Sequence, residues 1–147
     1  MTRWLRRRLG REDGAALIEA ALTLPLLLLI SVSILEFGRA YQVYQVVTNA
    51  AREGARVAVL PGTSNSDVTS RVQTYLQAGQ IANPSSATVQ VTSTTISIGG
   101  GTAAASKVEV DYPFSFVVLQ PVANLVTGSS TLGTPLTLTA VATMRNE

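Results

Sequence analysis

Gly14, Ala15 and Glu19 have residue types and spacing that suggest chemistry near the N-terminus. Glu19 is the only charged residue in the apolar run from Ala15 to Leu35. A carboxylate at the centre of a membrane helix costs about 2.5–3.5 kcal/mol on insertion scales, so Glu19 needs an ion-pair partner or a route to water. It lies about 6 Å inside Ala15, at about 1.5 Å per residue, within reach of the nearest headgroups.

The usual catalytic and metal-binding side chains are missing from the sequence. The 147 residues include no Cys and no His, which excludes disulfide scaffolds, Cys/His zinc sites, thiol catalysis and Ser-His-Asp triads. The nine acidic residues do not cluster, and the glycine run 99–101 is followed by neither Lys nor a helix, so it is not a phosphate loop. We therefore expect no enzyme, no metal site and no cofactor. A membrane-tethered hydrolase using Ser or acidic residues is the remaining enzymatic alternative.

The composition indicates a membrane-associated protein. Hydrophobic residues make up 46% and charged residues 14%, against a usual charged share of roughly 25%. Residues 1–13 carry five Arg against Glu12 and Asp13, whereas the rest of the chain has six basic and seven acidic residues. The basic character thus belongs to a short leader. A nucleic-acid interface needs Lys or Arg spread along a face with aromatic residues to stack on, so we expect no nucleic-acid binding.

The run 15–35 predicts a membrane-spanning helix. At about 1.5 Å per residue it reaches roughly 31 Å, enough to cross a hydrocarbon core. The hydroxyls of Thr23, Ser31 and Ser33 can bond back to carbonyls of the same helix. Because the Arg-rich leader precedes the run, the positive-inside rule predicts a cytoplasmic N-terminus and an exported body. A buried core helix of a soluble protein is the alternative.

An amphipathic stripe continues this helix to about Leu60, where Pro61 and Gly62 should end it. Its narrow apolar face is rich in Ala. Gly54, which costs roughly 1 kcal/mol relative to Ala within a helix, is expected to permit close approach of the head or of a partner. Glu36 is expected to be interfacial.

Beyond residue 61 the sequence predicts a small α+β head. A short helix should span residues 67–78, with Ser66 as its N-cap and Gly79 as its stop. Alternating apolar and polar residues from residue 87 onward predict a three- or four-stranded antiparallel sheet, with the first turn at the glycine run 99–101.

The junction between the basic leader and the apolar run resembles a prepilin peptidase site. It reads Asp-Gly-Ala-Ala-Leu-Ile-Glu over residues 13–19. In type IV pilins and pseudopilins cleavage follows the Gly, and the Glu occupies the fifth mature position. The resemblance implies that Gly14 and Ala15 flank the scissile bond and that Glu19 contacts a neighbouring subunit. An uncleaved signal anchor and a cleaved secretory signal peptide are the alternatives; the second lacks a small-x-small site after the apolar run.

Two further motifs resemble the TadE-like proteins of tight-adherence (Tad/Flp) pilus systems. They are Glu-Phe-Gly-Arg at 36–39 and Thr-Asn-Ala-Ala-Arg-Glu-Gly-Ala-Arg at 48–56. The related TadF and TadG proteins share parts of the pattern, and TadG-like chains are usually much longer. The resemblance implies a bacterial minor pilin or pseudopilin that helps to assemble an adhesive, type IV pilus-like fibre, without catalysis of its own.

This resemblance implies three regions, a membrane location and a set of partners. The regions are a leader (1–14), a transmembrane and amphipathic helix (15–60) and an exported α+β head (61–147). The expected partners are the inner membrane, other pseudopilins, the major pilin, the Tad inner-membrane platform and a prepilin peptidase. A partner-facing helix surface is expected at Arg52, Glu53, Gly54 and Arg56; alternatively the charged residues among them form a solvated helix face. A permanently anchored extracytoplasmic binding module is the alternative function.

Overall fold

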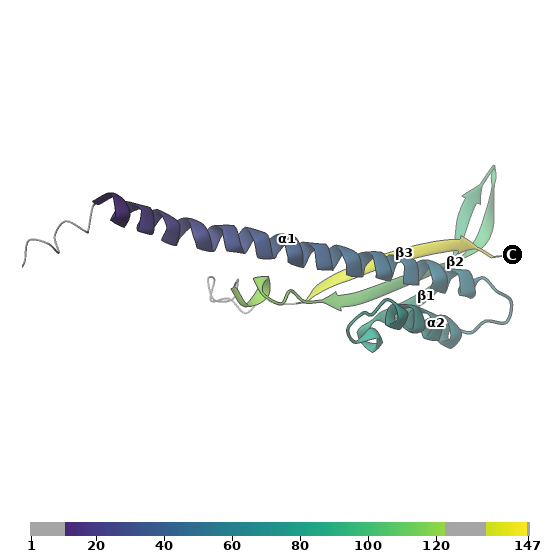
Figure 1. Ribbon diagram of the computed structural model, residues 1–147. Helices are drawn as coiled ribbons and strands as arrows, with labels where there is room; N and C mark the ends of the chain where they lie inside the picture. Colours follow the sequence, from purple (N-terminus) through teal and green to yellow (C-terminus); the bar gives the residue numbers. More distant parts are fainter. Residues whose placement is uncertain (1–10, 123–134, 147) are drawn as a thin grey trace, which may run out of the picture.

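The computed structural model describes residues 11–122 and 135–146. One long helix, α1 (Arg11–Ala58), carries a head made of α2 (Asn65–Ala78), the short 3-10 helix η2 (Pro84–Ser86) and three strands. The strands are β1 (Thr88–Ile98), β2 (Gly101–Phe114) and β3 (Leu136–Arg145). Figure 1 shows the sheet and α2 packed along the C-terminal part of α1, while the N-terminal part of the helix extends beyond them. This arrangement confirms the predicted α+β fold.

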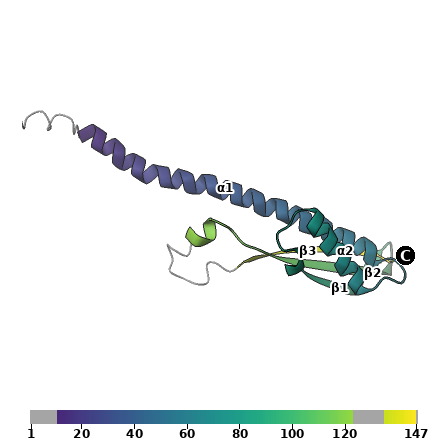
Figure 2. The same ribbon diagram turned by 60° about the horizontal axis from the view of Figure 1, so that its bottom comes forward.

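Helix α1 is continuous from the apolar run into the amphipathic stripe (Figures 1 and 2). It passes through Pro25 without a break. The hydroxyls of Thr23, Ser31 and Ser33 donate hydrogen bonds of 2.9, 2.8 and 2.7 Å to the carbonyls four residues earlier, as predicted. These hydroxyl groups thus find their hydrogen-bond acceptors within the helix itself. The helix ends two residues before the predicted Leu60, and the chain reverses through Gly62, whose φ is +78°.

Helix α2 begins two residues earlier than predicted, so Ser66 is not its N-cap. Ser64 takes that position: its Oγ accepts the Asp67 N–H, while the Asp67 carboxylate accepts the Ser64 N–H at 2.9 Å. This reciprocal capping box, with the acid three residues after the cap, explains why Ser64 is preferred over Ser66. Gly79 ends the helix as predicted, with its N–H donating to the Tyr75 carbonyl.

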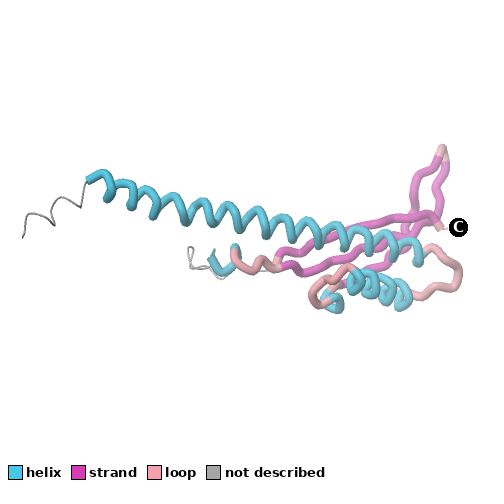
Figure 3. The backbone as a smooth tube through the Cα atoms, viewed as in Figure 1, coloured by secondary structure: helices cyan, strands magenta, loops and turns pink. Residues whose placement is uncertain are grey.

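The sheet is antiparallel, with β2 in the centre and β1 and β3 at its edges (Figure 3). Gly99 and Gly100 form the two-residue turn between β1 and β2, and both have positive φ. Two-residue hairpin turns favour glycine because positive φ costs it little. The predicted turn and strands are confirmed, and the described residues contain three strands.

The core lies between one face of the sheet and the two helices. Buried Val and aromatic side chains of β2 face the Ala-rich side of α1, and three residues of α2 close one flank. The opposite face of the sheet is polar: Lys107 pairs with Glu109 at 2.7 Å, and Thr139 donates to Asp111 across the strands. Small Ala side chains on α1 let the head approach closely. The main core residues are Val47, Ala50, Ala51, Ala55, Val68, Val72, Leu76, Val108, Val110 and Ala140.

Candidate functional site

The projecting part of α1, residues 14–35, is the feature most in need of an external partner, and we call it the arm. An 18-residue apolar stretch of this helix is entirely unburied by the rest of the chain. Exposed leucines and isoleucines surround it, for example Leu17 at 71%, Leu22 at 72% and Ile34 at 67% exposure. An apolar surface on all sides over this length matches the requirement of a bilayer crossing. The arm therefore has the properties of a single-pass membrane anchor, and the alternative of a buried core helix is not supported.

Gly14 and Ala15 lie on an exposed turn of the arm. A Cβ added at Gly14 would meet no atom of the described chain within 4 Å. Packing within the chain therefore gives no reason for glycine at this position. The leader residues 1–10 lie outside the described residues.

Glu19 is also exposed on the arm, one helical turn beyond Ala15. Among the described residues no basic side chain lies within ion-pair distance of its carboxylate. The chain itself thus offers Glu19 no charge partner in this part of the structure. Its predicted role at a subunit contact remains a prediction.

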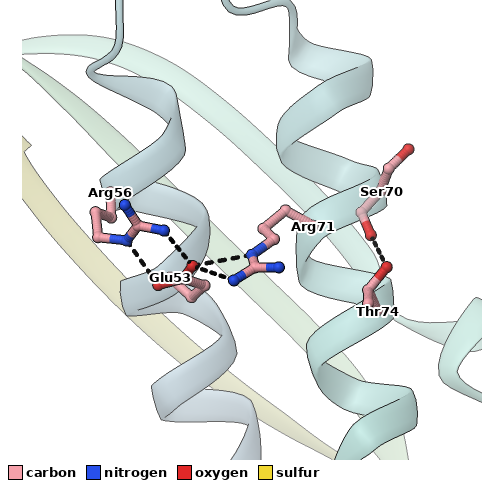
Figure 4. A network of polar contacts seen from close by, with 5 residues as sticks. All are labelled: Glu53, Arg56, Ser70, Arg71 and Thr74. Carbon is pink, nitrogen blue, oxygen red and sulfur yellow. Dashed lines mark hydrogen bonds and ion pairs between the residues drawn. The ribbon is translucent and has the colours of Figure 1, made fainter.

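Glu53 joins α1 to α2 through a compact ion-pair network (Figure 4). Its carboxylate accepts two hydrogen bonds from Arg56, of 2.6 and 2.9 Å, and two from Arg71 of α2, of 2.7 and 2.9 Å. These hydrogen bonds, Arg56 first and then Arg71, lower the pKa of Glu53 from 4.5 to about 2. The carboxylate is therefore ionised at any physiological pH and helps to hold α2 against α1.

Gly54 faces the head's own core. A Cβ there would lie 2.7 Å from Cγ2 of Val72 and 3.2 Å from Cγ1 of Val108. The close approach predicted for this glycine is therefore made by α2 and β2.

The remaining charged residues of the predicted partner-facing surface point outward. Arg52 is exposed and donates a 3.4 Å hydrogen bond to Asn49, and the Arg56 side chain is 58% exposed. Two of the four predicted residues, Glu53 and Gly54, thus make contacts within the chain that hold α2 and β2 against α1. A partner for this surface remains a prediction.

Glu36 has a role that the sequence interpretation missed. It was expected to be interfacial, but only 7% of its surface is exposed, because the segment after β2 packs over it. Its carboxylate accepts the backbone N–H groups of Val117 at 2.9 Å, Val118 at 3.2 Å and Leu119 at 3.5 Å. Residues 119–122 then form a helical turn, so Glu36 caps it with an acceptor and a negative charge.

Arg39 and Phe37 extend this contact. Arg39 donates a 2.7 Å hydrogen bond to the Ser115 carbonyl and lies 4.8 Å from the centre of the Phe114 ring. Phe37 meets Phe116 edge to face, with 5.5 Å between ring centres. The Glu-Phe-Gly-Arg motif at 36–39 therefore fastens the end of β2 and residues 115–119 to α1. We call this set of contacts the clasp. The only sequence signal for it was a lone acid at the boundary between the apolar and amphipathic parts of the helix.

A long exposed apolar helix that carries a small α+β head is the architecture of a membrane-anchored, pilin-like protein. The family described as TadE-like protein matches residues 14–56, which confirms the resemblance expected from the motifs. The matched segment contains the arm, the α1 side of the clasp and Glu53, but none of the strands. It supports a pilin-like protein associated with Tad pili. Comparisons with curated proteins and with solved structures give no match.

Proposed function

We propose that the protein is a minor pilin or pseudopilin that takes part in assembling a Tad/Flp-type adhesive pilus. One observation carries this proposal: the TadE-like match starts at Gly14 and follows the exposed arm into the clasp. The arm would lie in the bacterial inner membrane, with the leader in the cytoplasm and the head exported, because the Arg-rich leader precedes the apolar run. Residues 1–14, 15–60 and 61–147 would then act as leader, membrane and stalk helix, and exported head.

Two residues of the arm would carry the assembly chemistry. A prepilin peptidase would cleave after Gly14, which leaves a new amine on Ala15. The Glu19 carboxylate of one subunit would pair with the Ala15 amine of its neighbour. Since both groups would lie in a low-dielectric surrounding, such a pair would fix the axial register of helices that otherwise slide on apolar surfaces.

The partners of this function would be other pseudopilins, the major pilin, the Tad inner-membrane platform and the prepilin peptidase. The exposed Arg52 and Arg56 are available to such partners on the outer side of α1. No step of this function requires catalysis by the chain.

Complementation of a deletion strain tests the proposal. Wild type should restore pili, and its intact mass should show loss of residues 1–14. The Gly14→Val variant should retain the leader, whereas Gly38→Val, at another helical glycine with open surroundings, should be processed. The Glu19→Gln and Glu19→Leu variants should be processed and inserted yet fail to restore pili.

Two results would contradict the proposal. The first is that the wild-type chain keeps its leader in the presence of the peptidase, and that pili form in the deletion strain that lacks the chain. The chain would then be a permanently anchored binding module. If both Glu19 variants restore pili as well as wild type does, Glu19 makes no required subunit contact.

A further inference from the structure

Residues 117–122 lie beside the arm and not beside the sheet (Figures 1 and 2). This segment and the arm form the two walls of an open groove of about 580 Å³. One wall is formed by five arm residues between Pro25 and Val32, and the other by Val118 and Val122. The lining is almost wholly apolar. The head therefore returns a short segment of chain alongside the same helix that has the properties of a membrane anchor.

The depth of this groove follows from helix geometry. At about 1.5 Å per residue, Val32 lies about 5 Å, and Pro25 about 15 Å, from Leu35 into the apolar run. Half of a typical hydrocarbon core is about 15 Å. With the arm in a bilayer, the groove thus falls within the leaflet on the side of the head.

The surface of the segment suits this depth. Val117 is 64%, Val118 41% and Val122 37% exposed, and no charged residue occurs between Asp111 and Arg145 in the sequence. The one long polar side chain among residues 117–122, Gln120, is partly buried. The exposed parts of these three valines lie next to the arm, so their apolar surface is available to lipid.

The backbone of the segment is also prepared for a non-aqueous surrounding. In hydrocarbon each unpaired N–H or C=O group costs several kcal/mol, so irregular backbone needs internal partners. Glu36 accepts the N–H groups of residues 117–119, Arg39 donates to the Ser115 carbonyl, and the Val122 N–H donates to the Val118 carbonyl at 3.2 Å. The clasp supplies most of these bonds from α1 itself.

We propose that residues 117–122 are a second membrane contact, and that lipid acyl chains of the head-side leaflet fill the groove between this segment and the arm. The groove is continuous with the apolar surface of the arm, which itself requires lipid. Glu36 would be the positioning residue that holds the segment at this depth. The inference rests on membrane insertion of the arm but not on pilus assembly.

Single-cysteine variants of the full chain test the proposal, because the natural sequence has no Cys. Val118→Cys reports on the groove, Leu22→Cys on the arm, and Val141→Cys, at a valine 50% exposed on the outer sheet face, on water. Each variant is labelled with an environment-sensitive fluorophore and reconstituted in vesicles of phosphatidylcholine and phosphatidylglycerol. Quenching by aqueous iodide and by lipids that carry a doxyl group in the acyl chain is then compared. Circular dichroism verifies that each labelled chain keeps its secondary structure.

We expect the label at Val118 to follow the label at Leu22: quenched by doxyl lipid and several-fold less accessible to iodide than the label at Val141. Quenching at Val118 by iodide alone, with Leu22 in lipid, would overturn the second contact and leave the anchor intact. Protection at Val118 from both quenchers would show that protein, and not lipid, fills the groove and would also overturn the proposal. Iodide access at Leu22 would overturn both the contact and the anchor. Pilus formation enters none of these readouts, so the test is separate from that of the proposed function.

Discussion

At the scale of single residues, Gly54 and Glu53 determine how closely the head packs against α1. Gly54 removes a side chain where α2 and β2 approach, and Glu53 ties the neighbouring turn to Arg71. Both residues lie in a motif first noted for its resemblance to a family. The structure gives that motif a physical reason within the chain.

The Gly54→Ala substitution should destabilise the head. Its Cβ would lie 2.7 Å from a methyl group of Val72, which is fully buried and β-branched and therefore cannot move away easily. Overpacking costs typically 1–3 kcal/mol, and a gain of roughly 1 kcal/mol in helix propensity opposes it, so we expect a net loss of about 1 kcal/mol. Thermal unfolding of the full chain in detergent measures this.

The matched control for this prediction is Gly38→Ala. A Cβ at Gly38 would meet no other part of the described chain within 4 Å, so the propensity gain is unopposed and stability should not fall. Equal melting temperatures for Gly54→Ala and Gly38→Ala would show that the close approach at Gly54 is not required.

The Glu53 network should make stability depend on acid. The folded-state pKa of about 2 lies below the ordinary 4.5, so the network stabilises the fold above pH 4.5 and its contribution is lost as the pH falls from 4.5 towards 2. Both arginines are about half exposed, and exposed pairs contribute about 0.2–1 kcal/mol each, so Glu53→Gln should cost about 1 kcal/mol at neutral pH. Melting temperatures across this pH range for wild type and variant measure it.

Glu109→Gln is the control for this acid dependence. Glu109 pairs with Lys107 of its own strand, so its loss does not separate two elements. If the difference in melting temperature between wild type and Glu53→Gln stays constant down to pH 2, the assigned titration of Glu53 is wrong.

At the scale of elements, the clasp connects the end of β2 to α1. Residues 115–122 belong to no strand, and contacts with Glu36, Phe37 and Arg39 hold them in place. The sheet and the two helices are held by core packing, whereas this segment is held by hydrogen bonds and two aromatic contacts.

Removal of the Glu36 carboxylate should loosen this segment. Glu36→Ala leaves three backbone N–H groups without their acceptor, each worth about 1–3 kcal/mol when buried, so amide exchange of residues 115–122 should speed up by more than tenfold. Glu36→Gln keeps one acceptor oxygen and should lie between wild type and Glu36→Ala. Hydrogen–deuterium exchange read by mass spectrometry measures both.

Helix α2 serves as the internal control for the exchange experiment, since core packing of Val68, Val72 and Leu76 holds it and it should exchange alike in all three chains. Unchanged exchange of residues 115–122 in Glu36→Ala would show that the clasp does not depend on its carboxylate.

The elements differ in how far the sequence could predict them. Local signals sufficed for the apolar run, the glycine hairpin turn, Gly79 and the alternating strands, because each depends on neighbours within a few residues. The N-cap of α2 could not be chosen between Ser64 and Ser66 without knowing which backbone N–H the Asp67 carboxylate accepts. Glu36 could not be assigned from local pattern, since the N–H groups it accepts lie 81 to 83 residues later in the chain. Of the site residues, Gly14 and Glu19 still rest on the resemblance alone.

At the scale of the whole molecule, the arm and the C-terminal end of the last strand lie at opposite ends. The C-terminal end of β3 is at the end of α1 remote from the arm (Figure 1). A protein fused after Asn146 would therefore be held away from a membrane that contains the arm.

This arrangement makes the predicted orientation testable. An alkaline phosphatase fusion at the C-terminus should be active, because the Arg-rich leader keeps the N-terminus in the cytoplasm and the enzyme folds only after export. A fluorescent protein that matures only in the cytosol should be dark at the same position. The reverse pair of results would contradict the orientation.

The direction of β3 also determines how the head responds to a pulling force. This strand runs away from the arm, so tension between the arm and Asn146 acts along the strand. Hydrogen bonds in an antiparallel ladder are perpendicular to the strands, and ten consecutive residue pairs join β3 to β2. The load is thus applied in shear to the whole ladder at once, whereas a force across the sheet would open its pairs one after another. A head of this design resists extension along the axis of its anchor and yields most easily to a sideways pull.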